Sequence, residues 1–500
     1  MTTLRLGCIL LSAIGLLLAM SPWRCGWLAL LSLAPWAMAV RHSENWRECG
    51  GHGWILGFCF YSLLLDWIRT AGAESDWNWT GPHFLAWVAL SLTCSVSLGA
   101  HSLLLRWLFV RNCPAQLAVP IVFTLHEIIV DQVLRRHFGV NGALVQLALT
   151  QVHDSPILQM ADLGGAFLVT WLVAVANGLV IDVLGFCIDA RCLGTPRWRW
   201  SLLIGISQLV CAVVYGVWRT EFPERPGPPI GLVTTYAPVR GENPSDRPAP
   251  ALWIYPEDAN STAGLDADTA CVRFRLEAAR RGCPILIGCR RFEELPTPRL
   301  RNSLLLVSAG TGLVASYDKQ HLTPDTEIAS PVRAWIGGRE APTEGWFAPG
   351  DSNAVCHLPG GQGTIGLGIC HDVCFPEWSR SLLNEPVRPD ILVVCGAEQF
   401  DATGRVQHLL RACAQLRAVE SRRPLIRCVQ HGLSGMVDGC GRIRSVRVLS
   451  PFELMIDSVP LDGRTSVYAQ IGDSGFFGFL GLMMIVAAVF IRRRSKSGGR

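Results

Sequence analysis

The chain has 500 residues, of which 17% are charged and 50% are hydrophobic, and its mean hydropathy is +0.31. Soluble domains have roughly 25% charged residues, so part of this chain should lie outside water. The net charge of +4 is small and dispersed, which argues against a nucleic-acid partner. The 19 cysteines follow no CxxC…CxxC spacing. We therefore expect no metal site and no cofactor, and the spacing does not predict which cysteines could pair.

Long apolar runs fill the N-terminal part of the chain and return near its C-terminus. A helix needs about 20 apolar residues to cross the hydrocarbon layer of a membrane. Such runs lie near 4–22, 24–40, 53–70, 83–108, 115–132, 162–185, 200–218 and 474–491. They predict an N-terminal transmembrane region at 1–218 with about seven spans, and one C-terminal transmembrane span at 474–491.

Basic residues in the loops between these runs predict the orientation of the chain, because cytoplasmic loops are enriched in Lys and Arg. One side of the membrane collects Arg41, Arg47, Arg106, Arg111, Arg191, Arg197, Arg199 and the C-terminal Arg492–Arg494 group. Arg135 and Arg136 fall on the other side. We therefore expect both termini in the cytoplasm and an exported segment at 219–473.

The fifth run contains three polar residues, His126, Glu127 and Asp131. A charge inside a bilayer costs a few kcal/mol or more, so these residues need an explanation. They could line a cavity or a substrate path. They could equally belong to a helix end that lies at the interface or packs against another helix, and the sequence leaves both interpretations open.

A proline-rich linker at 219–229 separates the membrane region from a mixed segment at 230–470. Short apolar runs predict strands at Ile230–Thr235, Leu252–Tyr255, Ile285–Ile287, Ser303–Val307, Thr364–Ile369, Ile391–Val394 and Leu425–Val429. Helical patterns lie between some of them, at Ala270–Arg281 and Gln407–Arg422. Strands that alternate with helices indicate a layered α/β domain.

Two polar segments follow strand-like runs in this domain. Trp253-Ile-Tyr-Pro-Glu257 places a carboxylate after an apolar strand, where it could act as a general base. Ser316-Tyr-Asp-Lys319 places a lysine in a similar position, with Glu327 eight residues further on. A buried lysine could neutralise an oxyanion. Taken alone, each segment also fits a solvated loop residue.

A cysteine ends the third such run, Gly366-Leu-Gly-Ile-Cys370, and His371 and Asp372 follow it. A cysteine at a strand-to-turn position can be exposed to substrate, and backbone N–H groups beside it can bind an oxyanion. A nearby lysine could lower its pKa. Among 19 cysteines, a buried structural thiol is the alternative, and Cys374 is a second candidate four residues away.

The three segments in this order resemble the nitrilase, or carbon–nitrogen hydrolase, superfamily. Further matching stretches are Phe347-Ala-Pro-Gly350 and Arg417-Ala-Val-Glu-Ser-Arg-Arg-Pro424. The resemblance implies an αββα sandwich with a Glu–Lys–Cys triad. It would make Glu257 the base, Lys319 the oxyanion stabiliser and Cys370 the nucleophile.

A nitrilase-like domain inserted into a multi-span α-helical membrane protein is similar to the bacterial apolipoprotein N-acyltransferase family. Gln159-Met-Ala-Asp-Leu-Gly-Gly-Ala166 also resembles that family's pattern. The resemblance implies transfer of a phospholipid acyl chain, through a cysteine thioester, to the N-terminal diacylglyceryl cysteine of a lipoprotein. It also implies a bacterial inner-membrane location with the catalytic domain in the periplasm. Glu327, His371 and Asp372 would support the triad.

The chain departs from that family at two places near the triad. His371-Asp372 stands where the family has Tyr-Glu, and Cys395-Gly-Ala-Glu-Gln-Phe-Asp401 stands where it has Ser-Asn-Asp-Ala-Trp-Phe-Gly. Two other functions therefore remain as alternatives. One is a membrane-tethered amidase that uses water as the acceptor, and the other is a catalytically silent scaffold.

Overall fold

The computed structural model describes residues 3–70, 80–153, 155–188, 196–221, 225–234, 249–259, 267–293, 299–324, 326–329, 346–399, 404–450 and 453–495. The chain forms two compact units. The first contains 1–136, 141–221 and 471–500, and the second contains 137–140 and 222–470. Each unit is described separately below.

The first unit is helical. Its helices are α1 (Thr3–Ala19), α2 (Ala29–Arg41), α3 (Trp46–Leu64), α4 (Asp66–Thr70), α5 (Thr80–Val110), α6 (Ala115–Phe138), α7 (Ala161–Ile188), α8 (Pro196–Thr220) and α14 (Asp473–Ser495). Helices therefore occupy all of the apolar runs. Five described segments are long and apolar enough to cross a membrane: His83–Val110, Ala115–Phe138, Pro156–Leu184, Trp200–Thr220 and Asp473–Ile491. The apolar helices at Thr3–Ala19 and Gly26–Arg41 are shorter. The expected number of spans stays a prediction.

The polar residues of α6 are buried and hydrogen-bonded inside this unit. His126 Nε2 lies 2.7 Å from the Tyr61 hydroxyl, and His126 Nδ1 lies 3.0 Å from Ser97 Oγ. Glu127 accepts a hydrogen bond of 2.7 Å from the backbone N–H of Leu147. These contacts satisfy polar groups that would be costly among apolar helices. They favour the packing interpretation of His126 and Glu127.

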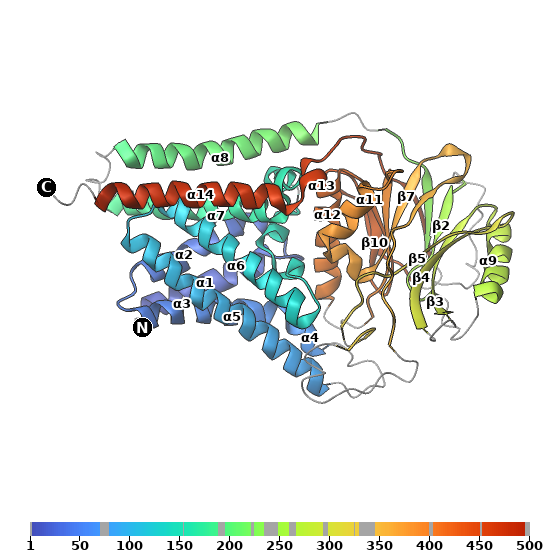
Figure 1. The fold of residues 1–500 in the computed structure, drawn as a ribbon, viewed down its shortest axis with the longest axis horizontal. Coiled ribbons are helices and arrows are strands. Elements are labelled where there is room, and N and C mark those ends of the chain that lie inside the picture. Colours follow the sequence, from blue (N-terminus) through green and yellow to red (C-terminus); the bar gives the residue numbers. More distant parts are fainter. Residues whose placement is uncertain are drawn as a thin grey trace. The chain divides into compact units, whose positions relative to one another are not determined.

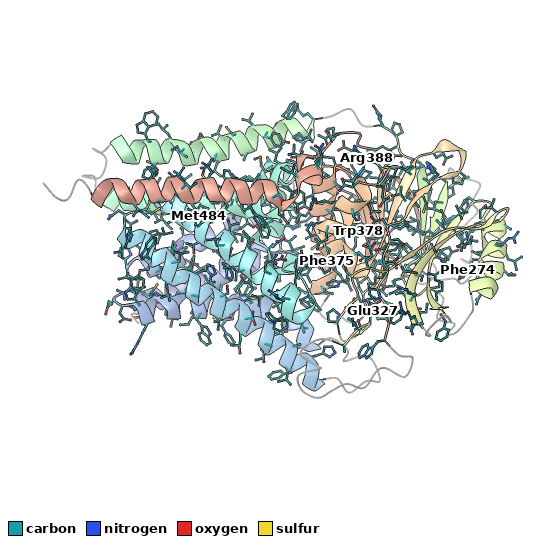
Figure 2. The ribbon with its side chains drawn as sticks, in the orientation of Figure 1. Phe274, Glu327, Phe375, Trp378, Arg388 and Met484 are labelled. Atoms are coloured by element: carbon teal, nitrogen blue, oxygen red, sulfur yellow. The ribbon has the colours of Figure 1, made fainter. Side chains whose placement is uncertain are left out.

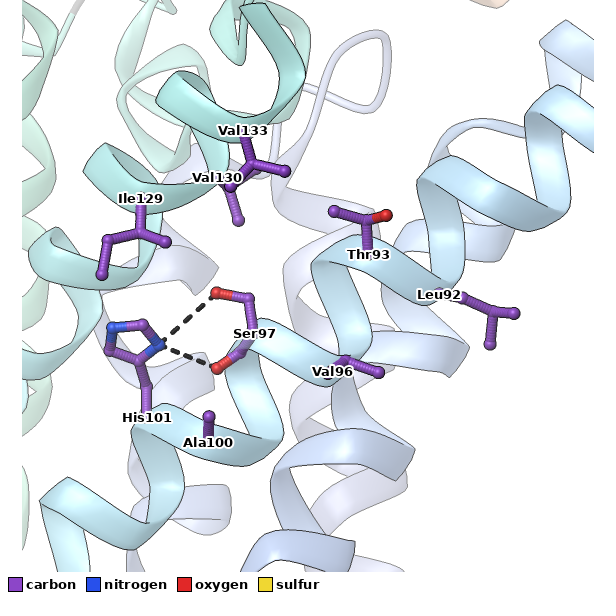
Figure 3. A pocket seen from close by; sticks show the side chains of 9 residues that line it. All are labelled: Leu92, Thr93, Val96, Ser97, Ala100, His101, Ile129, Val130 and Val133. Carbon is purple, nitrogen blue, oxygen red and sulfur yellow. Dashed lines mark hydrogen bonds between the residues drawn. The ribbon is translucent and has the colours of Figure 1, made fainter. Parts of the chain in front are cut away.

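Asp131 has a similar role, because it accepts the backbone N–H of Gly142 at 2.8 Å and pairs with Arg135 at 2.8 Å. A cavity of about 580 Å³ does lie beside α5 and α6 (Figure 3). Its lining residues are Leu92, Thr93, Val96, Ser97, Ala100, His101, Ile129, Val130 and Val133. The three polar residues of α6 are not among them, so they do not line this cavity.

The second unit is an α/β sandwich of two six-stranded sheets (Figure 1). The first sheet, in spatial order, contains β12 (Leu454–Ser458), β1 (Pro229–Val233), β2 (Leu252–Ile254), β3 (Ile285–Glu293), β4 (Arg299–Ser308) and β5 (Gly312–Asp318). The second contains β11 (Ile443–Val448), β10 (Leu433–Val437), β9 (Leu425–Gln430), β8 (Ile391–Ala397), β7 (Thr364–Ile369) and β6 (Val355–His357). Helix α9 (Ala267–Arg281) lies outside the first sheet. Helices α11 (Pro376–Leu383) and α12 (Arg405–Ser421) lie outside the second, and α13 (Val467–Ile471) follows β12.

Alternating side chains build the two sides of the first sheet. In β2, Leu252 and Ile254 belong to the core between the sheets, whereas Trp253 belongs to a second cluster with Phe274 of α9. Figure 2 shows Phe274 on the outer side of the first sheet. Successive side chains of a strand point to opposite faces of its sheet. A strand that is covered by the other sheet on one face and by a helix on the other is therefore expected to be apolar throughout. This arrangement confirms the α/β sandwich that the sequence predicts.

The two ends of the sandwich domain are neighbours. Strand β1, the first of the domain, pairs antiparallel with β12, the last, in a register that places Ile230 opposite Asp457. The pairing extends outward, because the backbone N–H of Leu461 donates to the carbonyl of Arg225 at 2.9 Å. The chain therefore enters and leaves this domain at the same edge of one sheet.

Glycine in β7 makes room for a tryptophan of α11. A Cβ atom on Gly368 would lie 2.4 Å from Trp378 Cζ2, closer than atoms can approach. The Trp378 indole is fully buried, and its Nε1–H donates to the carbonyl of Leu367 at 2.9 Å. The glycine-rich strand before Cys370 is thus explained by close packing of helix α11 on the sheet.

Gly368→Ala should destabilise the sandwich domain by about 1–3 kcal/mol, because the added methyl group displaces a buried indole. Guanidinium unfolding of the purified protein in detergent micelles measures this change. Gly310→Ala is the matched control, since a Cβ there meets nothing within 4 Å, and it should change stability by less than about 0.5 kcal/mol. Equal effects of the two substitutions would contradict this account of the glycine.

Candidate active site

Three strand ends carry the candidate triad. Glu257 follows β2, Lys319 follows β5 directly, and Cys370 follows β7 directly. The exposed fractions of Glu257, Lys319 and Cys370 are 7%, 2% and 9%. Two sheets therefore contribute to one set of buried polar residues, as expected for an α/β site at strand ends.

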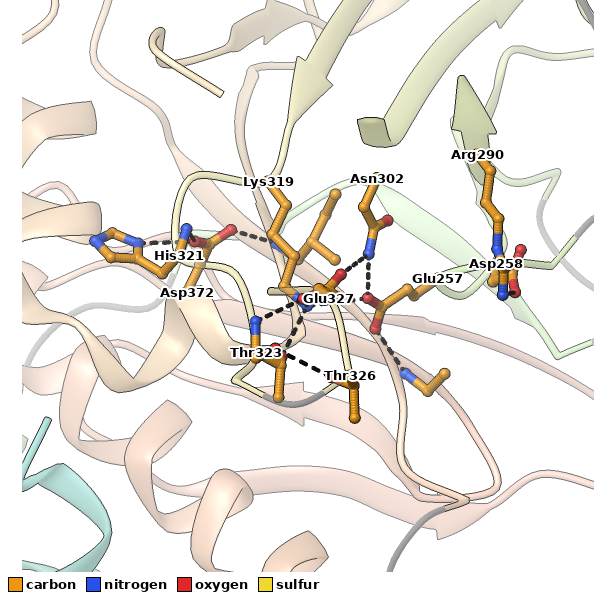
Figure 4. A network of polar contacts seen from close by, with 12 residues as sticks. Glu257, Asp258, Arg290, Asn302, Lys319, His321, Thr323, Thr326, Glu327 and Asp372 are labelled. Atoms are coloured by element: carbon orange, nitrogen blue, oxygen red, sulfur yellow. Dashed lines mark hydrogen bonds and ion pairs between the residues drawn. The ribbon is translucent and has the colours of Figure 1, made fainter. Parts of the chain in front are cut away.

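Lys319 lies between two carboxylates (Figure 4). Its Nζ is 3.1 Å from Glu257 Oε1 and 2.7 Å from Glu327 Oε2. A buried ammonium is stable only when it is paired and hydrogen-bonded. Glu327, which the sequence placed in a supporting role, thus contacts the same lysine as Glu257.

Asn302, a residue of β4, joins the two carboxylates. Its amide nitrogen donates to Glu257 Oε1 at 2.6 Å and to Glu327 Oε1 at 2.5 Å (Figure 4). The remaining oxygens accept backbone N–H groups, from Ala397 to Glu257 Oε2 at 3.0 Å and from Thr323 to Glu327 Oε2 at 2.7 Å. Each carboxylate oxygen of the two glutamates therefore accepts at least one hydrogen bond.

The two glutamates differ in how readily they accept a proton. Burial and the nearby charge of Glu327 raise the pKa of Glu257, in spite of the opposing effect of Lys319. Burial also acts on Glu327, but the charge and hydrogen bond of Lys319 outweigh it and lower the pKa of Glu327. The same two carboxylates hold the pKa of Lys319 well above its ordinary value against the effect of burial. Glu327 therefore stays ionised, and Glu257 is the carboxylate better suited to proton transfer.

Cys370 occupies an unusual backbone conformation with φ of +44°. Left-handed φ values are uncommon outside glycine and cluster at functional sites. The conformation turns the chain from β7 into the short 3₁₀ turn η8 (Cys370–Cys374). Burial and the charge of Glu257 raise the pKa of the Cys370 thiol, whereas Lys319 lowers it. The thiol thus needs a base before it can react.

Asp372 anchors this turn. Its carboxylate accepts hydrogen bonds from the Tyr317 hydroxyl at 2.7 Å and from the backbone N–H groups of Ile369 and His321 at 2.9 and 3.0 Å. The His321 ring also lies against it, at 2.8 Å. The shorter acid that replaces the family's glutamate therefore has a complete set of contacts around η8.

Besides Cys370 and Asp372, the turn η8 contains His371 and Cys374, whose side chains do not anchor it. His371 is partly buried, its ring packs edge-on against Phe375, and burial together with the charge of Lys319 lowers its pKa to about 4. Cys374 is fully buried and its thiol is hydrogen-bonded to Cys413, which raises the pKa of Cys374. Cys374 is thus engaged elsewhere, and Cys370 remains the better candidate nucleophile.

The sequence analysis assigned no role to Asn302, Tyr317 or Ala397, which hold the site residues through long-range hydrogen bonds. Tyr317 and Ala397 stand in segments that it singled out, whereas only a position beside an apolar run marks Asn302. The altered loop at 395–401 is described as far as Gln399, and its last two residues lie outside the described part of the chain.

Two family models match the chain. The N-terminal domain of apolipoprotein N-acyltransferases matches residues 12–179, and the carbon–nitrogen hydrolase domain matches residues 250–462. A protein named apolipoprotein N-acyltransferase from Geobacter metallireducens is 25% identical over 94% of this chain and 92% of its own length. Another of that name, from Azotobacter vinelandii, is 27% identical over 85% of this chain and 83% of its own length. The chain is thus similar to apolipoprotein N-acyltransferases over both of its domains.

The two matched domains and the names of these relatives indicate that the chain is an acyltransferase. Its long apolar helices, together with the same relatives, indicate a protein of the bacterial inner membrane. An amidase from Nesterenkonia sp. is a similar solved structure, with a TM-score of 0.36, 19% identity, and coverage of 51% of this chain and 98% of that one. The carbon–nitrogen hydrolase model and the two stacked sheets assign the fold of the second unit.

We expect His371 to make the stability of the domain depend on pH. Its pKa falls from an ordinary value near 6.5 to about 4 on folding, so the unfolded chain binds the proton more tightly. Stability should therefore be complete above about pH 6.5 and decrease as pH falls towards 4. His371→Gln should flatten this decrease in guanidinium unfolding measured from pH 7 to pH 4, whereas His357→Gln, at an exposed position, should leave it unchanged. A slope that His371→Gln does not alter would assign the dependence to other groups.

Proposed function

We propose that the chain N-acylates the N-terminal diacylglyceryl cysteine of lipoproteins, with a phospholipid as acyl donor and a thioester on Cys370 as intermediate. The observation that carries this proposal is the Lys319 ammonium held between Glu257 and Glu327 near the Cys370 strand end. This arrangement supplies a base, a cation and a nucleophile, the three groups that acyl transfer through cysteine needs.

In the first half-reaction, Glu257 takes the thiol proton as Cys370 Sγ attacks the carbonyl carbon of a phospholipid ester. Lys319 and backbone N–H groups near Cys370 stabilise the oxyanion, and one well-placed donor contributes roughly 3–4 kcal/mol. The carbon–oxygen ester bond then breaks, and the leaving alkoxide of the lysophospholipid takes the proton from Glu257. The acyl chain remains as a thioester on Cys370.

In the second half-reaction, the α-amine of the lipoprotein cysteine attacks the thioester carbonyl. Glu257 accepts a proton from the attacking nitrogen, the carbon–sulfur bond breaks, and the proton returns to Cys370. The products are an amide and the free enzyme. One cysteine that serves two substrates in turn implies ping-pong kinetics.

Glu327, Asp372 and His371 have supporting roles in this proposal. Glu327 stays ionised and keeps Lys319 charged while Glu257 exchanges its proton. Asp372 holds the turn that presents Cys370. His371 stays neutral near pH 7, because its pKa is about 4, so it adds no second cation to the site.

The membrane region suits the two lipid substrates. Five described segments are able to cross a membrane, and a chain anchored there meets phospholipids and lipoproteins without releasing them into water. The loop arginines support an orientation with both termini in the cytoplasm. We therefore propose that the catalytic domain faces the periplasm.

Mass spectrometry of the purified protein in phospholipid micelles tests the thioester. We expect one acyl mass on the peptide that contains Cys370, and loss of that mass when a diacylglyceryl lipopeptide is added. Cys370→Ser should carry no such thioester, since a serine hydroxyl at this position is a far weaker nucleophile. Cys374→Ser is the matched control and should keep the adduct on Cys370.

Two results would contradict the proposal. An adduct that water discharges as fast as the lipopeptide would indicate an amidase-like hydrolase. A wild-type protein that takes no acyl group from phospholipid would leave the scaffold alternative.

Glu257→Gln should slow formation of the acyl adduct by about 10²–10⁴-fold, the usual contribution of a general base. The glutamine keeps the shape and the acceptor oxygen of the side chain but cannot take the thiol proton. Stopped-time mass spectrometry of the Cys370 peptide measures the rate. Glu277→Gln is the matched control, because it removes a buried carboxylate from α9 on the far side of the sheet. This control should leave the rate of adduct formation within about twofold of the wild-type rate. A rate that Glu257→Gln leaves unchanged would exclude Glu257 as the base.

A further inference from the structure

The loop after β8 departs from the family pattern, and its residue Glu398 is almost fully buried. The exposed fraction of Glu398 is 1%, and its ion-pair partner Arg427, a residue of β9, is 3% exposed. Replacing such a pair with apolar residues is often neutral or stabilising. Burial of these two charges is therefore weak evidence of a purely structural role.

Glu398 is held in place from three directions. Arg427 Nη2 donates to its Oε1, and its own backbone N–H donates to the carbonyl of Gln430 at 2.9 Å. Gly432 lies against the other oxygen, since a Cβ there would be 2.4 Å from Glu398 Oε2. The carboxylate thus has one defined position.

That position connects Glu398 to the base. The preceding residue, Ala397, donates its backbone N–H to Glu257 Oε2 at 3.0 Å. Fixing Glu398 on Arg427 and Gln430 restrains the adjacent residue Ala397, whose N–H group orients Glu257. The strand end that lost the family's asparagine and tryptophan therefore still contacts the site through its backbone.

Glu398 also adds to the charge around the nucleophile. Among the described residues, charged groups that act on the Cys370 thiol include Glu257, Lys319, Glu398 and Glu327. The backbone at Gly396 is close to the same residue, because a Cβ there would lie 3.9 Å from Cys370 Cα. A third carboxylate raises the pKa of the Cys370 thiol further, so the thiol keeps its proton until a base removes it.

We propose that Glu398, paired with Arg427, is a positioning residue that holds the Ala397 N–H on Glu257 and places a third negative charge at Cys370. This inference rests on the proposed roles of Glu257 and Cys370. It assigns a role in the site to the loop segment that departs from the family.

Glu398→Gln separates this role from simple packing, because it keeps the size of the side chain and removes its charge. Iodoacetamide labelling of the Cys370 peptide, measured against pH by mass spectrometry on the full protein in detergent micelles, should shift to lower pH by about half a unit or more. Acyl transfer from phospholipid to Cys370 should at the same time slow by about tenfold or more, as Glu257 loses its orientation.

Glu420→Gln is the matched control, since Glu420 and Arg417 form another ion pair in which each side chain is 1% exposed. Its labelling profile should match that of the wild type, whatever its effect on thermal stability. Superimposable profiles for Glu398→Gln and wild type would overturn the proposal, and so would an equal shift in Glu420→Gln. Labelling needs no phospholipid, so a wild type that is not acylated rejects the proposed function while the labelling shift still tests Glu398.

Discussion

The Lys319 ammonium carries its charge in a residue that is only 2% exposed, and this constraint organises the site. A single carboxylate would balance the charge, but it could not also exchange protons without leaving the lysine unpaired. In the proposed mechanism, two carboxylates, Glu257 and Glu327, divide these tasks. Asn302 keeps them at a fixed separation by donating to both. Removing one partner of a buried ion pair typically costs about 3–5 kcal/mol. The stability of the domain therefore depends on the same residues as the proposed chemistry.

Much of this site is readable from the sequence, because Glu257, Lys319, Glu327 and Asp372 each stand in short segments with a fixed spacing to an apolar strand. The apolar runs likewise predict seven of the strands, since buried strands of a sandwich are nearly continuous in hydrophobicity. Strands β10, β11 and β12 contain polar residues among the apolar ones or are partly exposed. A search for continuous apolar runs therefore does not detect them. For β5 the sequence indicates only a strand-like run before Lys319, without bounds, because exposed residues interrupt its apolar pattern. Strand β6 has only three residues and is missed.

The sequence does not reveal the hydrogen-bond partners of the buried polar residues. Asn302 acts on Glu257 and Glu327 from a different strand, and His126 meets Tyr61 from a different helix. No local spacing encodes such contacts, which arise only when distant segments fold together. The polar residues of α6 illustrate the difference: their residue types left a substrate path and a packing role equally open, and only the hydrogen-bond partners favour packing.

The antiparallel pairing of β1 with β12 has a consequence for the architecture of the whole chain. Because Ile230 and Asp457 face each other across one sheet edge, the polypeptide leaves the globule beside the point where it entered. For the helices on either side in the sequence, the entire sandwich domain is topologically equivalent to a short connecting loop. Such a module can be acquired, lost or exchanged in evolution without lengthening the path between the flanking helices, and it can fold as a closed unit once its last strand has been synthesised.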